Sequence, residues 1–171
     1  MQKHVLRYRV SLGVFIFGLA ISGLTAFPLL HELRSLASLL NITDPGKYQQ
    51  LAGLRHWIAY VLFGLEQLHS KFPFMAYGTD WLAFGHLAIG IFFVRPLLKP
   101  LESDWVLKCG LLCCVGVLPL AMIAGAIRGI PFYWRLIDCS FGVLGALPLL
   151  YCLHLTREMR QSVTVNVRPL A

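Results

Sequence analysis

The feature that most constrains this chain is a set of uncharged apolar runs, each about as long as a lipid bilayer is thick. The first run extends from Val10 to Leu30 without one charged side chain. About 20 helical residues cross a hydrocarbon core of roughly 30 Å. Because peptide groups in lipid must bond to one another within a helix or a closed barrel, such runs predict membrane-spanning helices.

The composition agrees with this prediction. Apolar residues make up 57% of the chain and charged residues only 13%, and the mean hydropathy is +0.69. Soluble domains carry about 25% charged residues. Lipid must therefore contact much of the surface of this protein, and a water-soluble class is excluded.

The basic residues and the cysteines exclude two further classes. The net charge is +7, but the fifteen lysines and arginines are scattered singly between apolar runs and form no stripe, so we expect no nucleic-acid partner. The five cysteines lie inside apolar segments without a Cys-x-x-Cys spacing. We therefore predict neither a disulfide framework nor a metal site.

The predicted fold is an all-α integral membrane protein: a four-helix transmembrane bundle with an extracytoplasmic helical cap, forming a single membrane domain over residues 1–171. The expected spans are residues 10–30, 81–98, 106–127 and 136–155. Lys3, Arg7 and Arg9 precede the first run as in a signal peptide, but the run is too long for one, so we expect a retained helix. Residues 156–171 are expected to form a cytoplasmic tail.

The cap is expected to comprise residues 31–80. Within it, residues 50–68 have apolar side chains at alternating spacings of three and four, which is typical of an amphipathic helix. Whether this segment spans the membrane is left open, because its fully apolar part, Trp57 to Leu65, is short for a span. Five spans are therefore the alternative.

The positive-inside rule favours four spans, because lysines and arginines accumulate at cytoplasmic span ends. With four spans, six basic residues lie outside and nine lie in the cytoplasm: Lys3, Arg7, Arg9, Arg95, Lys99, Lys108, Arg157, Arg160 and Arg168. With five spans the preference reverses. We therefore expect four spans with both termini in the cytoplasm.

Ionisable side chains at or within spans are costly and are by default a functional hypothesis. Under the four-span topology the candidate ligand-binding residues share one leaflet: His31, Glu32, Asp80, His86, Arg128, Arg135 and Asp138. The cap would add Arg55, His56, Glu66 and His69 to this group.

Two interpretations remain open for the arginines. Arg135 and Asp138 lie three residues apart on one helix, so they could pair and only fix the depth of that helix. Alternatively, Arg128 and Arg135 could cradle an anion, because guanidinium groups bind phosphates and carboxylates bidentately.

His86 also carries alternatives. It could be a structural histidine, or it could ligate haem b together with His31, although haem ligands in helical bundles lie deeper. A membrane-embedded enzyme using His86 and Asp80 is a further alternative, but no His-Glu-x-x-His or Gly-x-Ser-x-Gly spacing is present. The catalytic residues are unknown, and we expect no cofactor.

The favoured function is therefore non-enzymatic: an accessory or binding protein whose outer-leaflet polar site holds an anionic ligand, a lipid headgroup or a partner. The expected partners are membrane lipids, with a membrane protein or a second copy of the chain as further candidates. The ligand, the oligomeric state and the pathway are not predicted.

Two strings resemble motifs of a family of small bacterial inner-membrane proteins without an assigned activity. They are YGTDW at residues 77–81 and RGIPFYWRLID at residues 128–138, and the likeness covers most of the chain from Phe15 onward. The resemblance implies a multi-pass protein of a bacterial inner (plasma) membrane with a shared set of outer-face motifs. It implies nothing about activity.

Overall fold

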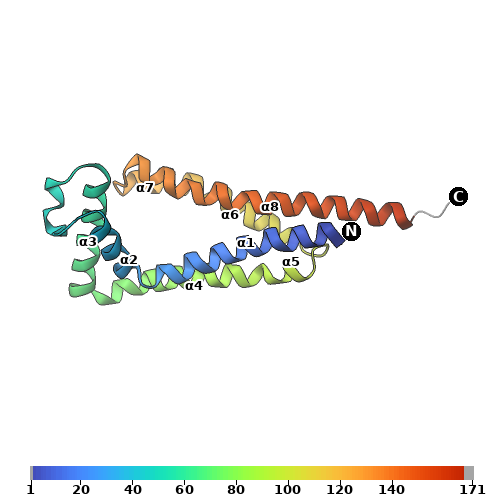
Figure 1. The fold of residues 1–171 in the computed structure, drawn as a ribbon, viewed down its shortest axis with the longest axis horizontal. Helices are drawn as coiled ribbons and strands as arrows, with labels where there is room; N and C mark the ends of the chain where they lie inside the picture. Colours follow the sequence, from blue (N-terminus) through green and yellow to red (C-terminus); the bar gives the residue numbers. More distant parts are fainter. Residues whose placement is uncertain (1, 168–171) are drawn as a thin grey trace. The chain divides into compact units, whose positions relative to one another are not determined.

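The structure, a computed structural model, describes residues 2–167, with side chains described as far as residue 162. No strand occurs among these residues. The elements follow one another in the order shown in Figure 1: α1 (Gln2–Ala26), α2 (Leu29–Leu39), η1 (Pro45–Gln50), α3 (Gly53–Lys71), η2 (Pro73–Ala76), α4 (Tyr77–Phe92), α5 (Val94–Leu98), α6 (Asp104–Pro119), η3 (Leu120–Ala124), α7 (Gly125–Ile127) and α8 (Phe132–Val167).

Four helical segments in this part of the chain are long and apolar enough to cross a membrane: Gln2–Ala26, Pro73–Leu98, Asp104–Ile127 and Phe132–Ser162. The predicted fold class, an all-helical protein with four membrane-crossing helices, is therefore confirmed. Helix α3 is not among the four. Its polar residues at both ends leave too short an apolar stretch, as the pattern around Trp57 to Leu65 suggested.

Several boundaries differ from the sequence prediction; helix α4, for example, begins at Tyr77, within the residues assigned to the cap. The first helix was expected to reach Leu30 but ends at Ala26. Pro28 has no N–H to donate to the preceding turn, and the chain starts a new helix at Leu29. The segment expected to be a tail from residue 156 continues as helix α8 through Val167, and Thr156 and Met159 are buried. Arg168 lies outside the described residues.

The described chain divides into two compact units. The first contains residues 2–19 and 89–167, and its core joins α1, α6 and α8. Its fully buried side chains include Tyr8 and Leu12 from α1, Leu107 from α6, and Leu149 and Cys152 from α8. Apolar side chains meeting at this place hold the N-terminal half of α1 against the α6–α8 hairpin.

Glycines allow α6 and α8 to approach closely. A Cβ atom added at Gly142 of α8 would lie 2.5 Å from the main-chain oxygen of Cys114 in α6. A Cβ atom at Gly110 of α6 would lie 2.9 Å from the Leu149 side chain. Small residues at such crossings are how helices pack in membranes, where burial of apolar surface gives no driving force.

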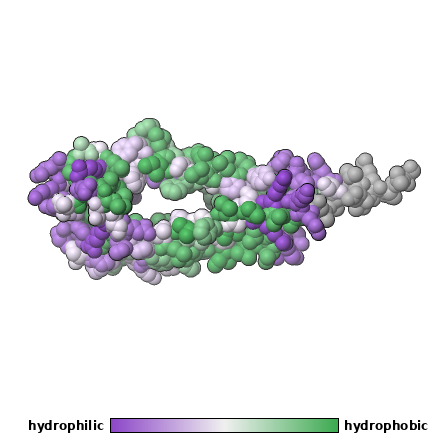
Figure 2. Space-filling model, viewed as in Figure 1, coloured by the Kyte–Doolittle hydropathy of each residue, from purple (hydrophilic) through white to green (hydrophobic). Residues whose placement is uncertain are grey.

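Most apolar side chains of the first unit nevertheless face outward. In the segment Asp104–Ile127, only 17% of the most apolar stretch of 18 residues is buried, and Ile127 is 81% exposed. Figure 2 shows hydrophobic surface along α6 and α8 and hydrophilic surface near the N-terminus of α1. A surface this apolar fits lipid as the surrounding solvent.

The second unit comprises residues 20–88 and contains the α2–α3 hairpin. Ala37 of α2 and Ile58 and Leu62 of α3 are buried in it. Across the hairpin, the Arg34 Nε atom donates to the Glu66 carboxylate at 2.9 Å. The hairpin is the amphipathic structure that the pattern of residues 50–68 indicated, and its hydrophilic surface is visible in Figure 2.

Three side chains expected to join the polar cluster hold the second unit together instead. Arg55 donates to the main-chain oxygen of Asn41 at 3.0 Å. The His56 Nδ1–H group donates to the main-chain oxygen of Tyr48 at 2.8 Å, and Glu66 pairs with Arg34. Asn41 needs this support because it has a positive φ of 54°, which costs less for Asn than for most residues.

Candidate functional site

The sharp turn between α7 and α8 positions the candidate arginines of the first unit. Gly129 has a φ of +71°, a left-handed conformation that favours glycine. The N–H group of Ile130 donates back to the Gly125 oxygen at 2.9 Å, which closes α7. The chain then reverses at Pro131, and α8 begins at Phe132. The RGIPFYWRLID string therefore contains the turn that connects α7 to α8 and the beginning of α8.

Arg135 is built into this turn by three contacts. Its Nη1 atom donates to the main-chain oxygen of Met122 at 3.1 Å. Its guanidinium carbon lies 5.4 Å from the centre of the Phe132 ring, a cation–π distance. Its aliphatic stem occupies the space beside Gly125, where an added Cβ atom would come within 2.8 Å of the stem. The guanidinium is therefore held in one place.

The acceptor of this hydrogen bond lies in an irregular part of the span. Met122 belongs to the π-helical segment Leu120–Ala124, which follows Pro119. Because proline lacks an N–H group and displaces the preceding turn, the regular hydrogen-bond ladder is broken there. Polar side chains satisfy such irregular backbone inside membranes, and π turns recur at functional sites.

The charge of Arg135 is not compensated within the described residues. No aspartate or glutamate there lies within ion-pair distance of it, and its Nε atom is buried without a hydrogen-bond partner. The Arg135–Asp138 pair, one of the two interpretations left open by the sequence, is therefore not found among these residues. Helical side chains tilt toward the N-terminus of their helix, so Arg135 extends back toward Met122 and away from Asp138.

The other two residues of this group are less constrained. Arg128 ends α7 and is exposed, and its side chain has no partner in the described part of the chain. Asp138 is half-buried one turn further along α8. The turn thus carries one fixed guanidinium at Arg135 and one solvent-facing guanidinium seven residues earlier.

The remaining candidates, His31, Glu32, Asp80 and His86, belong to the second unit. His31 and Glu32 are exposed in the first turn of α2, where Glu32 suits the positive end of the helix dipole. Asp80 is half-buried in the first turn of α4. No hydrogen bond or ion pair of the described residues brings these side chains together.

His86 has a defined tautomer. Its Nδ1 atom lies 2.8 Å from the Leu82 oxygen, and because a carbonyl only accepts, Nδ1 carries the proton. Its Nε2 atom is the nitrogen with the lone pair in the neutral ring. The residue lies where α4 packs on α1, since a Cβ atom at Gly23 would be 3.2 Å from the His86 Cβ atom.

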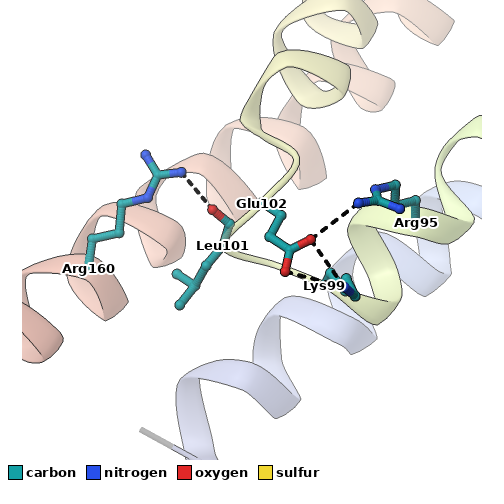
Figure 3. A network of polar contacts seen from close by, with 5 residues as sticks. All are labelled: Arg95, Lys99, Leu101, Glu102 and Arg160. Atoms are coloured by element: carbon teal, nitrogen blue, oxygen red, sulfur yellow. Dashed lines mark hydrogen bonds and ion pairs between the residues drawn. The ribbon is translucent and has the colours of Figure 1, made fainter.

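A polar network in the first unit was not found from the sequence. Arg160 of α8 pairs with Asp104 at 2.7 Å and donates to the Leu101 oxygen at 2.8 Å. Arg95 and Lys99 both contact the Glu102 carboxylate at 3.3 Å (Figure 3). Two basic residues before Pro100, Arg95 and Lys99, and two acidic residues after it, Glu102 and Asp104, were a visible signal in the sequence. Arg160 was instead expected in the tail.

The described residues contain an open groove beside charged side chains but no cluster of metal ligands. No group of three or more His, Cys, Asp or Glu side chains there could hold a metal ion. An open groove of about 460 Å³ in the second unit is lined by Arg34, Asn41 and Glu66 among others. Its charged members already pair with each other, so it offers no uncompensated charge.

The chain is thus a multi-pass membrane protein by the length and composition of its four candidate spans, in which Arg135 is the fixed and uncompensated cation at a helix turn. Comparison of the sequence and the structure with known protein families, curated proteins and solved structures finds no match.

Proposed function

We propose that this protein is a non-enzymatic accessory or binding protein of the membrane whose polar site at the α7–α8 turn holds an anionic ligand. The observation that carries the proposal is the Nε atom of Arg135, which is buried and without a hydrogen-bond partner among the described residues. Buried polar groups are normally satisfied, and an unsatisfied one calls for an explanation. An anion at this turn would accept from Nε and compensate the charge.

The chemistry of the ligand follows from the guanidinium. A planar guanidinium presents paired N–H donors that match two oxygens of a phosphate or a carboxylate. Arg135 is anchored through Nη1, so its remaining donors have a fixed direction. Arg128, exposed at the end of the same turn, supplies a second positive charge. A phospholipid headgroup is the ligand of this chemistry that every membrane contains.

We propose that both termini lie in the cytoplasm, so that the α7–α8 turn faces the outer leaflet of a bacterial inner membrane. The positive-inside rule supports this orientation, because basic residues gather at the ends of α1, α5 and α8. The resemblance of residues 77–81 and 128–138 to bacterial inner-membrane proteins supports the choice of membrane.

The second candidate function is a haem-binding redox subunit, or a membrane-embedded enzyme, that uses His86. The observation in its favour is the hydrogen bond from Nδ1 to the Leu82 oxygen, because metal-bound histidines commonly donate their other N–H group to a carbonyl. Against it, His31 is exposed in α2, and within the described residues it makes no side-chain hydrogen bond or ion pair that would orient its ring.

The test of the proposed site is lipid analysis of purified protein. Mass spectrometry should find less anionic lipid retained by Arg135→Gln than by the wild-type protein. Arg135→Lys should retain less anionic lipid than the wild-type protein, because an ammonium group keeps the charge but cannot donate two parallel hydrogen bonds to a phosphate. Lys47→Gln, which removes an exposed cation of the second unit, is the control. Equal retention by wild type and Arg135→Gln would refute the site.

A further inference from the structure

A basic face covers the charged end of the first unit. Contacts bring the N-terminal turns of α1, the α5–α6 connection and the last described turns of α8 together, since Glu158 pairs with His4 and Arg160 pairs with Asp104. These segments carry eight lysines and arginines, which we call the basic face: Lys3, Arg7, Arg9, Arg95, Lys99, Lys108, Arg157 and Arg160. Three carboxylates oppose them, from Glu102, Asp104 and Glu158.

All three carboxylates are already in use. Asp104 pairs with Arg160 at 2.7 Å, and Glu158 contacts His4 and His154 at 3.5 Å and 3.3 Å. Glu102 is shared between two cations. The other five cations of the face are exposed and have no ion-pair partner in the described part of the chain: Lys3, Arg7, Arg9, Lys108 and Arg157.

The Glu102 carboxylate is shared between Arg95 and Lys99. Arg95 and Lys99 both lie 3.3 Å from the Oε2 atom of Glu102, so this cluster keeps one net positive charge (Figure 3). All three side chains are more than half exposed. A carboxylate held by two cations at a surface occupies the position that a phosphate oxygen would take, and surface ion pairs of this kind are weak.

The location of the basic face indicates which class of anion it would meet. It lies at the ends of two helical segments that are long and apolar enough to cross a membrane, Gln2–Ala26 and Asp104–Ile127, so a bilayer crossed by them would end near this face. Anionic phospholipid headgroups are the negative charges concentrated at that depth, and they attract basic clusters next to spans. We infer that the basic face binds anionic phospholipids, with Glu102 as an internal anion that competes with the lipid phosphate for Arg95 and Lys99.

The basic face does not include Arg135. Substitutions of its cations and of its carboxylate should change the affinity for anionic lipid in opposite directions. Replacing both cations, Arg95→Gln with Lys99→Gln, should weaken binding of anionic lipid. Replacing the competitor, Glu102→Gln, should strengthen it. Each unit of positive charge gained or lost near an anionic surface changes the affinity for anionic lipid about fivefold.

The experiment is a titration of purified protein in detergent with phosphatidylglycerol, with phosphatidylcholine and inorganic phosphate as separate arms, read by native mass spectrometry. Glu66→Gln is the matched control for Glu102→Gln, because Glu66 also neutralises one exposed arginine but lies in the second unit. Lys47→Gln is the control for the cation variants. Circular dichroism verifies that each variant is folded.

The expected result is about fivefold tighter binding of phosphatidylglycerol by Glu102→Gln and more than tenfold weaker binding by the double variant. The two control variants, Glu66→Gln and Lys47→Gln, should leave the affinity for phosphatidylglycerol unchanged. An unchanged or weaker affinity in Glu102→Gln would overturn the inference. Equal gains in Glu102→Gln and Glu66→Gln, or equal binding of phosphatidylcholine or free phosphate, would also overturn it.

Discussion

The Arg135 guanidinium of α8 donates to the main-chain oxygen of Met122, 3.1 Å away in the π-helical segment that follows α6. This bond joins a charged side chain to irregular backbone inside an apolar hairpin. It explains how one residue can both hold the turn closed and present a positive charge there.

Replacing Arg135 with lysine should lower the stability of the protein. Lysine keeps the charge but cannot reproduce the directed bond to Met122, so the loss should be about 1–2 kcal/mol. Thermal unfolding in detergent measures this effect. Arg128→Lys, at an exposed position without a described partner, should unfold at the wild-type temperature. Equal stability of Arg135→Lys and wild type would show that the bond contributes nothing.

Replacing Gly142 with alanine should separate α6 from α8. The new methyl group would lie 2.5 Å from the Cys114 carbonyl oxygen, and main chain cannot move aside as a flexible side chain can. Overpacking of this kind costs about 1–3 kcal/mol. Gly116→Ala in α6 is the matched control, because nothing lies within 4 Å of its added Cβ atom. Thermal unfolding of both variants should show a loss only in Gly142→Ala.

Replacing Arg160 with glutamine should loosen the connection between α5 and α6. Arg160 holds this connection through Asp104 and the Leu101 oxygen. Hydrogen exchange at the amides of residues 99–103 should become faster, while exchange in α3 should not change. Arg157→Gln removes an exposed arginine of the same helix and should leave exchange at residues 99–103 as in wild type.

The topology can be tested by labelling with a membrane-impermeant thiol reagent. Gln50→Cys and Lys71→Cys flank α3, and with four spans both should react from the same, extracytoplasmic side. Unmodified protein, which carries five native cysteines within its apolar segments, gives the background. Labelling of the two positions from opposite sides would contradict the four-span topology.

An absorption spectrum distinguishes the proposed function from the haem alternative. We expect purified protein to show no Soret band, because no residue that the structure describes holds the exposed His31 ring in place as a second ligand for His86. A Soret band that disappears in His86→Ala and in His31→Ala would instead support the redox subunit. Nitrogen chemical shifts of the His86 ring should report a proton on Nδ1.

The helical spans could be predicted from the sequence because their signal is local. Uncharged runs such as Val10 to Leu30 are long enough to cross lipid, and lipid leaves the backbone almost no alternative to helix. The amphipathic pattern of residues 50–68 likewise required only its own spacing. The end of the first helix was misplaced because a proline inside an apolar run can either end or kink a helix.

The candidate site was predicted only in part. The aromatic and basic residues between Arg128 and Arg135 marked a boundary turn, and that turn contains the fixed guanidinium. The partner of that guanidinium was not predictable. Asp138 is close in sequence, whereas Met122 comes near only because α7 and α8 reverse direction at Gly129.

The sequence by itself determined that this chain is helical and has four segments long and apolar enough to cross a membrane, because hydrophobic length is a property of single segments. Only the tertiary structure decided which charges are compensated. It assigned Glu66 to Arg34, Asp104 to Arg160 and Glu102 to two cations, and it gave Arg135 no carboxylate among the described residues. Ion pairs depend on a few ångströms between segments far apart in the chain, and folding alone sets those distances.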